Sequence, residues 1–204
     1  MAPVWSSWGG GLLTLSGANT FTGQTRVSDG VLRVTKSDGL HATSSLWVSD
    51  TGTFEIDGVA LNALASLTLD GGLAGRETLA GRGAASYSGL VTMIRHAMVG
   101  AAESSDTLTL SGGVKGLMDV PTNAAPILQK VGAGKLILAG TTSSFFFPEI
   151  LAGTLQVTGN NLLPANAITI GDATLDMTDT AQSVGSLNGG EQRQDRPGCD
   201  RRPD

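Results

Sequence analysis

The sequence predicts an all-β protein whose fold is a right-handed parallel β-helix, that is, a β-solenoid. The chain is expected to be a fragment of such a helix, with open ends. Three observations support this prediction: short stretches of alternating apolar and polar residues, glycine-rich turns between them, and an internal duplication. Alternation with a period of two is typical of strands with one buried face. Strand-and-turn units follow each other roughly every 20 residues, as expected when successive coils stack and share one core. About nine such coils would fit into the chain.

The composition favours many short strands. Hydrophobic residues make up 40% of the chain but aromatic residues only 4%, so aliphatic and small side chains must fill the core. Glycine accounts for 29 of 204 residues, about twice its usual ~7%, which suits tight corners. Charged residues make up only 15%, which argues against a disordered chain.

Two segments of the chain are copies of each other. The stretch GGGLLTLSG at residues 9–17 matches GAGKLILAG at 132–140, and Gly30–Val34 matches Gly153–Val157, all at one offset of 123 residues. Thr107–Gly112 (TLTLSG) is a further copy of the first phrase. Such agreement indicates duplication and hence a repeat architecture.

Each strand is expected around a pair of apolar residues two positions apart. In chain order these strands contain Leu13 and Leu15, Val31–Val34, Leu46 and Val48, Phe54 and Ile56, Leu67 and Leu69, Leu108 and Leu110, Leu136 and Leu138, Leu155 and Val157, Ile168 and Ile170, and Leu175 and Met177. Only Val91–Val99 has a helix-like pattern. We interpret it as two strands with a turn near Arg95-His96, because the regular strand spacing continues across it.

The β-helix is expected to occupy residues 9–190. Residues 1–8 lack the basic segment and the long apolar core of a signal peptide, and we interpret them as a non-native or disordered N-terminus. Residues 191–204 are charged, contain proline and show no periodicity, which predicts a disordered or frameshifted tail. No stretch approaches the ~18 apolar residues that a transmembrane helix needs.

The stretch Gly11–Val34 (GLLTLSGANTFTGQTRVSDGVLRV) closely resembles the passenger-associated transport repeat of bacterial autotransporters, G-x-L-T-L-S-G-x-N-T-Y-T-G-x-T-x-V-x-x-G-x-L-x-V. Phe21 stands where the family usually has tyrosine. The second copy, Val131–Val157, keeps the glycines and the final strand but replaces the Asn-Thr-Tyr-Thr-Gly centre with Thr142–Phe147.

Two further segments resemble the linking coils that separate such repeats, Gly81–Gly89 and Asp106–Gly112, so the resemblance extends over residues 9–190. It implies a type V secretion substrate: a passenger that crosses the outer membrane through its own C-terminal β-barrel, folds outside the cell and often serves as an adhesin. The repeats are thought to assist folding and export. The chain shows neither a signal nor a barrel, so the resemblance predicts a fragment.

The resemblance also implies a place and partners. We expect the full-length protein at the cell surface, associated with the outer membrane. Expected partners are host-surface or matrix glycans or proteins, the neighbouring passenger coils, and the missing barrel. Nucleic acid is not expected, because the net charge is −5 and the basic cluster Arg193–Arg202 is interleaved with acidic residues. Cys199 is the single cysteine, so no internal disulfide is possible.

No catalytic, cofactor-binding or metal-binding residue is assigned from the sequence. His41 and His96 lie far apart beside expected turns, whereas a metal site needs clustered ligands, so both are interpreted as exposed corner residues. No Gly-x-Ser-x-Gly or Gly-Asp-Ser-Gly phrase marks a hydrolase nucleophile. Lys135 is expected in a strand and not in a phosphate-binding loop.

The carboxylates support a second hypothesis, because β-helices also host carbohydrate-active enzymes, lyases or hydrolases, that use several carboxylates. Two sets correspond by repeat: Asp50, Glu55 and Asp57 with Asp172, Asp176 and Asp179. Glu55 and Asp176 are expected to point outward, and Asp57 and Asp179 to lie in turns. Several coils separate the two sets, so solvated surface charge is the favoured interpretation, and a cleft with three carboxylates on neighbouring coils would favour an enzyme.

The segment Phe145–Pro148 (FFFP) is the one conspicuous apolar cluster of the sequence. We interpret it as core filling at a bulge. The alternative is an exposed patch, which would be a natural adhesive contact.

Overall fold

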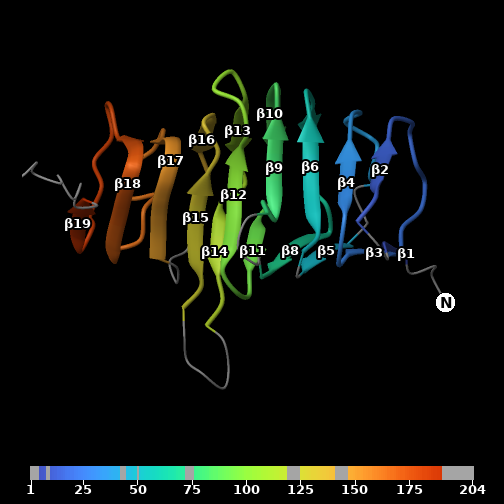
Figure 1. Cartoon of the computed structure of the whole chain (residues 1–204), viewed down its shortest axis with the longest axis horizontal. Helices are drawn as coiled ribbons and strands as arrows, with labels where there is room; N and C mark the ends of the chain where they lie inside the picture. The colour runs from blue at the N-terminus through green and yellow to red at the C-terminus, as the bar shows by residue number, and fades with distance from the viewer. Residues whose placement is uncertain are drawn as a thin grey trace, which may run out of the picture.

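The structure is a computed structural model that describes residues 5–7, 10–41, 45–49, 51–71, 76–118, 125–140 and 147–189. In these residues the chain winds as a parallel β-helix with three faces, and successive coils stack along the long axis of the molecule (Figure 1). Every strand pairing in the described part is parallel, because each strand pairs with the strand one coil away. The predicted β-solenoid is therefore confirmed.

The three faces are named here by their order along a coil. Face 1 contains β1 (Trp5–Ser7), β3 (Gln24–Val27), β5 (Ser45–Ser49), β8 (Ser66–Asp70), β11 (Val91–Met93) and β14 (Val114–Gly116). Face 2 contains β2 (Leu12–Leu15), β4 (Val31–Val34), β6 (Thr53–Asp57), β9 (Leu79–Arg82), β12 (Ala97–Ala101), β15 (Ile127–Val131), the first parts of β17 (Phe147–Val157) and β18 (Ala167–Asp176), and β19 (Ser186–Gly189). Face 3 contains β7 (Ala60–Leu61), β10 (Ala84–Tyr87), β13 (Thr107–Leu110), β16 (Lys135–Leu138) and the second parts of β17 and β18.

Face 2 runs through the whole described stack with nine strands, whereas the other two faces are partial. Among the strands that the structure describes, β14 is the last on face 1 and β7 the first on face 3. The long strand β17 turns the corner between faces 2 and 3, because its first part pairs with β15 and its second part with β16. These two faces thereby form one hydrogen-bonded sheet of 13 strands.

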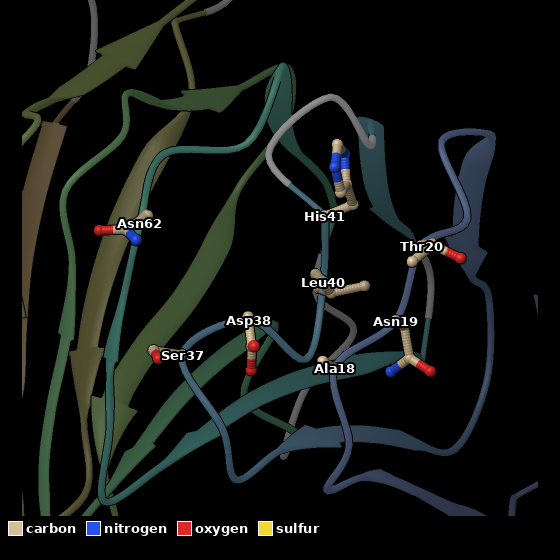
Figure 2. A pocket seen from close by; sticks show the side chains of 8 residues that line it. All are labelled: Ala18, Asn19, Thr20, Ser37, Asp38, Leu40, His41 and Asn62. Carbon is tan, nitrogen blue, oxygen red and sulfur yellow. The ribbon is translucent and has the colours of Figure 1, made fainter.

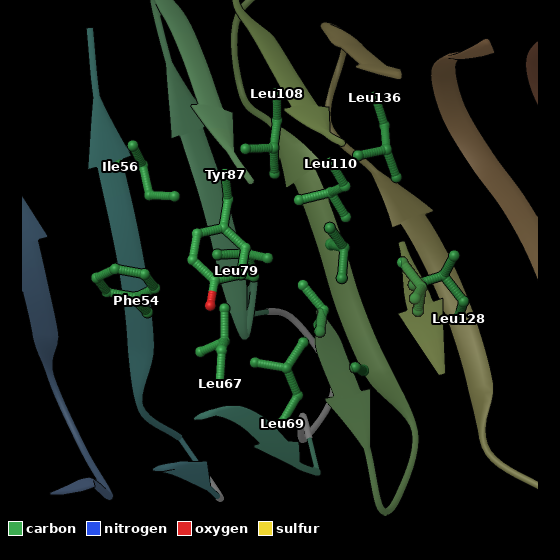
Figure 3. Packing of buried hydrophobic residues seen from close by; sticks show 14 of the residues in the cluster. Phe54, Ile56, Leu67, Leu69, Leu79, Tyr87, Leu108, Leu110, Leu128 and Leu136 are labelled. Carbon is green, nitrogen blue, oxygen red and sulfur yellow. The ribbon is translucent and has the colours of Figure 1, made fainter. Parts of the chain in front are cut away.

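The core lies inside the coils, where side chains of the same register position stack on one another. Leu46 packs over Leu67 along face 1, and Phe54 packs over Leu79 along face 2. All four side chains are at most 1% exposed. Figure 3 shows Leu67 of face 1 and Phe54 and Leu79 of face 2 together with Tyr87 from face 3, so all three faces contribute to one apolar interior. Period-two alternation forms this core because every second side chain points inward.

Two sequence expectations can be compared directly with the strands. Val91–Val99 indeed divides into β11 and β12 with a turn at residues 94–96, as predicted. Strand β1 lies inside the segment that was placed before the β-helix, and it pairs in parallel with β3 from Trp5 to Ser7. Among the described residues, parallel pairing is therefore already present at Trp5–Ser7.

The two copies of the repeat each wrap around one coil, but they start on different faces. In the first copy β2 pairs with β4, with Leu12 opposite Val31, on face 2. In the second copy β16 pairs with β17, with Lys135 opposite Thr154, on face 3. Because the two copies start on different faces, the offset of 123 residues does not correspond to a whole number of coils.

Candidate functional site

The outer side of face 2 carries a buried ion-pair cluster. Register places Arg33 opposite Glu55 on the next coil, and Arg82 one coil further on lies opposite Asp57. Nε of Arg33 donates to Oε1 of Glu55, and Nε of Arg82 donates to Oε2 over 2.7 Å. The carboxylate of Glu55 is therefore held between two guanidinium groups.

Glu55 is only 5% exposed, so its interpretation as solvated surface charge is wrong. It does face away from the core, as alternation with Phe54 and Ile56 requires. Two arginine side chains cover it from the neighbouring coils. Arg33 and Arg82 are 49 residues apart, and no sequence pattern joins them. The relevant signal was the coil-by-coil register, which only the structure shows.

A groove of about 420 Å³ lies beside this cluster and contains a second acid, Glu77. Arg76, Arg82, Thr53 and Met98 also line it. Burial, and then repulsion from the Glu55 carboxylate, raise the pKa of Glu77. This groove brings two carboxylates from neighbouring coils together, but each oxygen of the Glu55 carboxylate already accepts a hydrogen bond from an arginine.

The second set of predicted acids lies far away. Asp172 and Asp176 belong to β18, five coils from β6 along face 2, which corresponds to about 24 Å. Asp176 accepts hydrogen bonds from the backbone and side chain of Thr178 and from Gln156, and these bonds lower its pKa. Asp179 lies in a turn, as expected, with a positive φ of 59°. The same expectation is wrong for Asp57, which is the last residue of strand β6. The two sets do not meet, and Asp50 lies outside the described residues.

The two histidines are separate and exposed. The backbone N–H of Ile127 donates to Nδ1 of His96 over 2.9 Å. His41 lines a different groove, described below. Within the described residues no three His, Cys, Asp or Glu side chains are grouped as a metal ion would require.

This second groove, called the coil groove, has a volume of about 350 Å³ and crosses the first coils, where the described residues form no strand on face 3. It is lined by Ala18, Asn19, Thr20, Ser37, Asp38, Leu40, His41 and Asn62. Figure 2 shows the segment of Asn19 and Thr20 beside that of Asp38 and His41, with Asn62 beyond. Most of these residues carry hydrogen-bonding side chains.

Sequence reasoning missed a lysine inside the helix. Lys130 of β15 lies in register with Val99 and Ile150 and is 0% exposed. Its Nζ donates to the carbonyl oxygens of Val131, Gly132 and Ala152 over 2.8–2.9 Å. Burial lowers the pKa of Lys130 from 10.5 to about 8. The sequence did contain a signal for this burial. Strict alternation in Ile127–Val131 places Lys130 on the same, inward side of the strand as Leu128.

Two smaller expectations concern β16 and β17. Lys135 indeed begins β16, as predicted. Phe147 is 41% exposed, so core filling is wrong for this side chain, while its neighbour Pro148 is buried. Alternation explains the difference, because Phe147 occupies an outward position of β17. Phe145 and Phe146 lie outside the described residues.

Comparison with known proteins agrees with the coil pattern. The profile of the passenger-associated-transport-repeat family matches residues 8–34 and 128–145, which contain the first strands of both copies. The Adhesin BmaC autotransporter of Brucella suis biovar 1 (strain 1330) is 31% identical to the chain over 150 residues. These residues cover 73% of the chain, whereas the chain spans about 3% of that protein's length.

No solved structure matches the chain. The described part of the chain contains no helix with the length and apolar character needed to cross a membrane.

Proposed function

Because the chain belongs to the autotransporter passengers that carry passenger-associated transport repeats, we propose that it forms part of a β-helical stalk displayed on a bacterial cell surface for adhesion. The observation that supports this most is the stack of nine parallel strands on face 2. A continuous stack with axial backbone hydrogen bonds is stiff, and it holds loops at a distance from the cell. Its targets would be host-surface or matrix glycans or proteins.

Surface display by the whole chain tests this proposal. All 204 residues would be exported by a bacterial surface-display system, and attachment of the cells to cultured host cells and to matrix proteins would be counted. We expect attachment above that of cells carrying the empty display system. Attachment equal to the empty control, with display verified by antibody labelling, contradicts an adhesive role.

The second candidate function is a carbohydrate-active enzyme. The groove that contains Glu55 and Glu77 on neighbouring coils is the observation in its favour. A glycosidase or lyase needs one carboxylate that is free to take up or release a proton. Glu55 is bound by Arg33 and Arg82, so among the described lining residues Glu77 has no free partner acid. We therefore propose a non-enzymatic role.

Incubation with acidic and neutral polysaccharides tests the enzyme alternative. We expect no new reducing ends and no unsaturated sugar products. Release of either product by the wild-type chain, and its loss in Glu77→Gln, would establish the enzyme instead.

A further inference from the structure

We propose that the coil groove binds a linear, uncharged oligosaccharide that lies along the axis of the β-helix. The inference rests on the proposed adhesive function, for which it names the ligand class and the binding residues. The groove comes from the described residues of three successive coils: Ala18–Thr20 after β2, Ser37–His41 after β4, and Asn62 after β7.

The groove exists because face 3 is incomplete at this end. Strand β7 contains only Ala60 and Leu61, and among the described residues no strand pairs with it on the side of the earlier coils. There the chain crosses face 3 as irregular loops. Loops leave a concave surface where strands would form a flat one, and Figure 2 shows the two loops lying next to each other.

Hydrogen bonds between the loops hold the walls of the groove in place. The backbone N–H of Asn19 donates to the carbonyl oxygen of Asp38 over 3.3 Å. The side-chain amide of Asn19 donates to the carbonyl oxygens of Gly17 and Gly39 over 3.1 and 2.8 Å. Leu40 is 3% exposed and forms an apolar floor. A ligand therefore meets a surface that is already ordered, which reduces the entropy lost on binding.

The side chains at the rim favour hydroxyl groups as ligands. Thr20, Ser37 and Asn62 carry groups that both donate and accept hydrogen bonds, as a sugar hydroxyl does. The carboxylate of Asp38 lies 3.4 Å from Nζ of Lys36, so the charge of this acid is balanced. None of the described residues that line the groove is an arginine or a lysine, which disfavours a phosphate or an acidic sugar.

The spacing of the coils sets the length of the ligand. Hydrogen-bonded strands lie ~4.8 Å apart, and the three coils of the groove are therefore spaced by about the length of one sugar unit in an extended chain. Each coil can contact one sugar ring. Affinity should therefore rise from a monosaccharide to a trisaccharide and change little for longer chains.

Nuclear magnetic resonance titration of the 15N-labelled full chain tests the proposal. The probes are two series of uncharged, β-1,4-linked sugars that form extended chains, from glucose to cellohexaose and from N-acetylglucosamine to chitohexaose. We expect shifts of the backbone amides of Asn19, Asp38 and Asn62 with at least one series, and a Kd that falls up to the trisaccharide. No shift with either series at the solubility limit, or shifts confined to other coils, overturns the proposal.

Two variants separate this groove from other surfaces. Thr20→Ala and Asn62→Ala each remove one hydrogen-bonding side chain, and each should weaken binding about tenfold. Thr92→Ala removes a comparable group from the outer side of β11 on face 1 and should leave the Kd unchanged. Equal weakening by all three variants overturns the assignment to the groove.

The displayed chain distinguishes this inference from the proposed function. If wild-type cells attach and the Thr20→Ala and Asn62→Ala cells attach equally well, adhesion stands and the groove is not its site. If the purified chain binds the trisaccharide, Thr20→Ala and Asn62→Ala weaken this binding as expected, and no displayed cells attach, the groove stands and the adhesive function fails.

Discussion

Lys130 and Glu55 show how single charged residues are accommodated in a stack of apolar coils. Each is almost fully buried, and each is bonded by groups from a neighbouring coil. Lys130 bonds only uncharged carbonyl oxygens, whereas Glu55 bonds two cations. Since burial penalises the charged form unless an opposite charge compensates, the two residues should respond differently to pH and to substitution.

The stability of the chain should rise as the pH increases from about 8 to 10. The folded state holds the proton of Lys130 with a pKa of about 8, and the unfolded state with one near 10.5. In this window the unfolded chain binds more protons, so raising the pH favours the folded state, by up to about 3 kcal/mol in all. Urea unfolding at pH 7, 8, 9 and 10 measures this rise.

Lys130→Met is the control for this pH dependence. Methionine has no titrating group, so the rise should disappear in the variant. An equal rise in the variant would assign the effect to other residues.

Replacing Glu55 by glutamine should lower the free energy of unfolding by about 1–3 kcal/mol. The variant leaves Arg33 and Arg82 without the carboxylate that both now contact. The control is Lys36→Gln, which breaks the ion pair between Lys36 and Asp38. Their side chains are 49% and 56% exposed, respectively, so this variant should change the free energy of unfolding by no more than about 0.5 kcal/mol. Chemical unfolding at pH 7 measures both, and equal losses would show that burial of Glu55 does not matter.

At the scale of the element, the corners decide where a strand can turn onto the next face. Gly58 follows β6, and Gly153 lies within β17, and both have a φ of +65°. A side chain at Gly58 would meet open space, whereas a Cβ at Gly153 would meet the carbonyl oxygens of Gly132 and Gly134. The same backbone conformation therefore occurs in two different packing environments.

Gly58→Ala and Gly153→Ala should separate backbone strain from crowding. Alanine at either position adopts the left-handed conformation, which costs about 1–2 kcal/mol. Gly153→Ala should cost clearly more, because the carbonyl groups of the preceding coil must shift as well. Denaturant unfolding of the two variants measures the difference. Equal losses would mean that β17 relaxes around the added methyl group without further cost.

The strands were the most predictable elements, because alternation and glycine-rich turns are local signals. Leu13, Phe54 and Leu136 all lie in strands as expected. The face of each strand was not predictable, because it depends on the lengths of the intervening loops. The step from β12 to β15 takes 31 residues, from Ala97 to Leu128, whereas the step from Ile127 of β15 to Phe147 of β17 takes 20.

For the whole molecule, the sequence predicted the class of fold and the relationship to autotransporter passengers, but not the surfaces on which function depends. The coil groove combines Asn19 of the repeat motif with Asp38 and Asn62 from later coils, and no sequence pattern joins these three positions. Glu55 could be placed on the outer side but not beneath two arginines. Both features depend on which residues become neighbours when coils stack, and hence on the length of each coil.

A stack in which each coil contacts only its neighbours should lose structure locally when one coil is damaged. Leu79 of β9 is 0% exposed and lies in register with Phe54 of β6 and Val99 of β12. Leu79→Ala should destabilise these coils by about 2–5 kcal/mol. Hydrogen exchange measured by mass spectrometry should show faster exchange in β6, β9 and β12, whereas β16–β18 keep their protection. The control is Leu90→Ala, which truncates a leucine that is 45% exposed. It should not change hydrogen exchange by a comparable amount anywhere in the chain. Uniformly faster exchange along the chain in Leu79→Ala would indicate a single cooperative unit, in which damage to one coil weakens the whole β-helix.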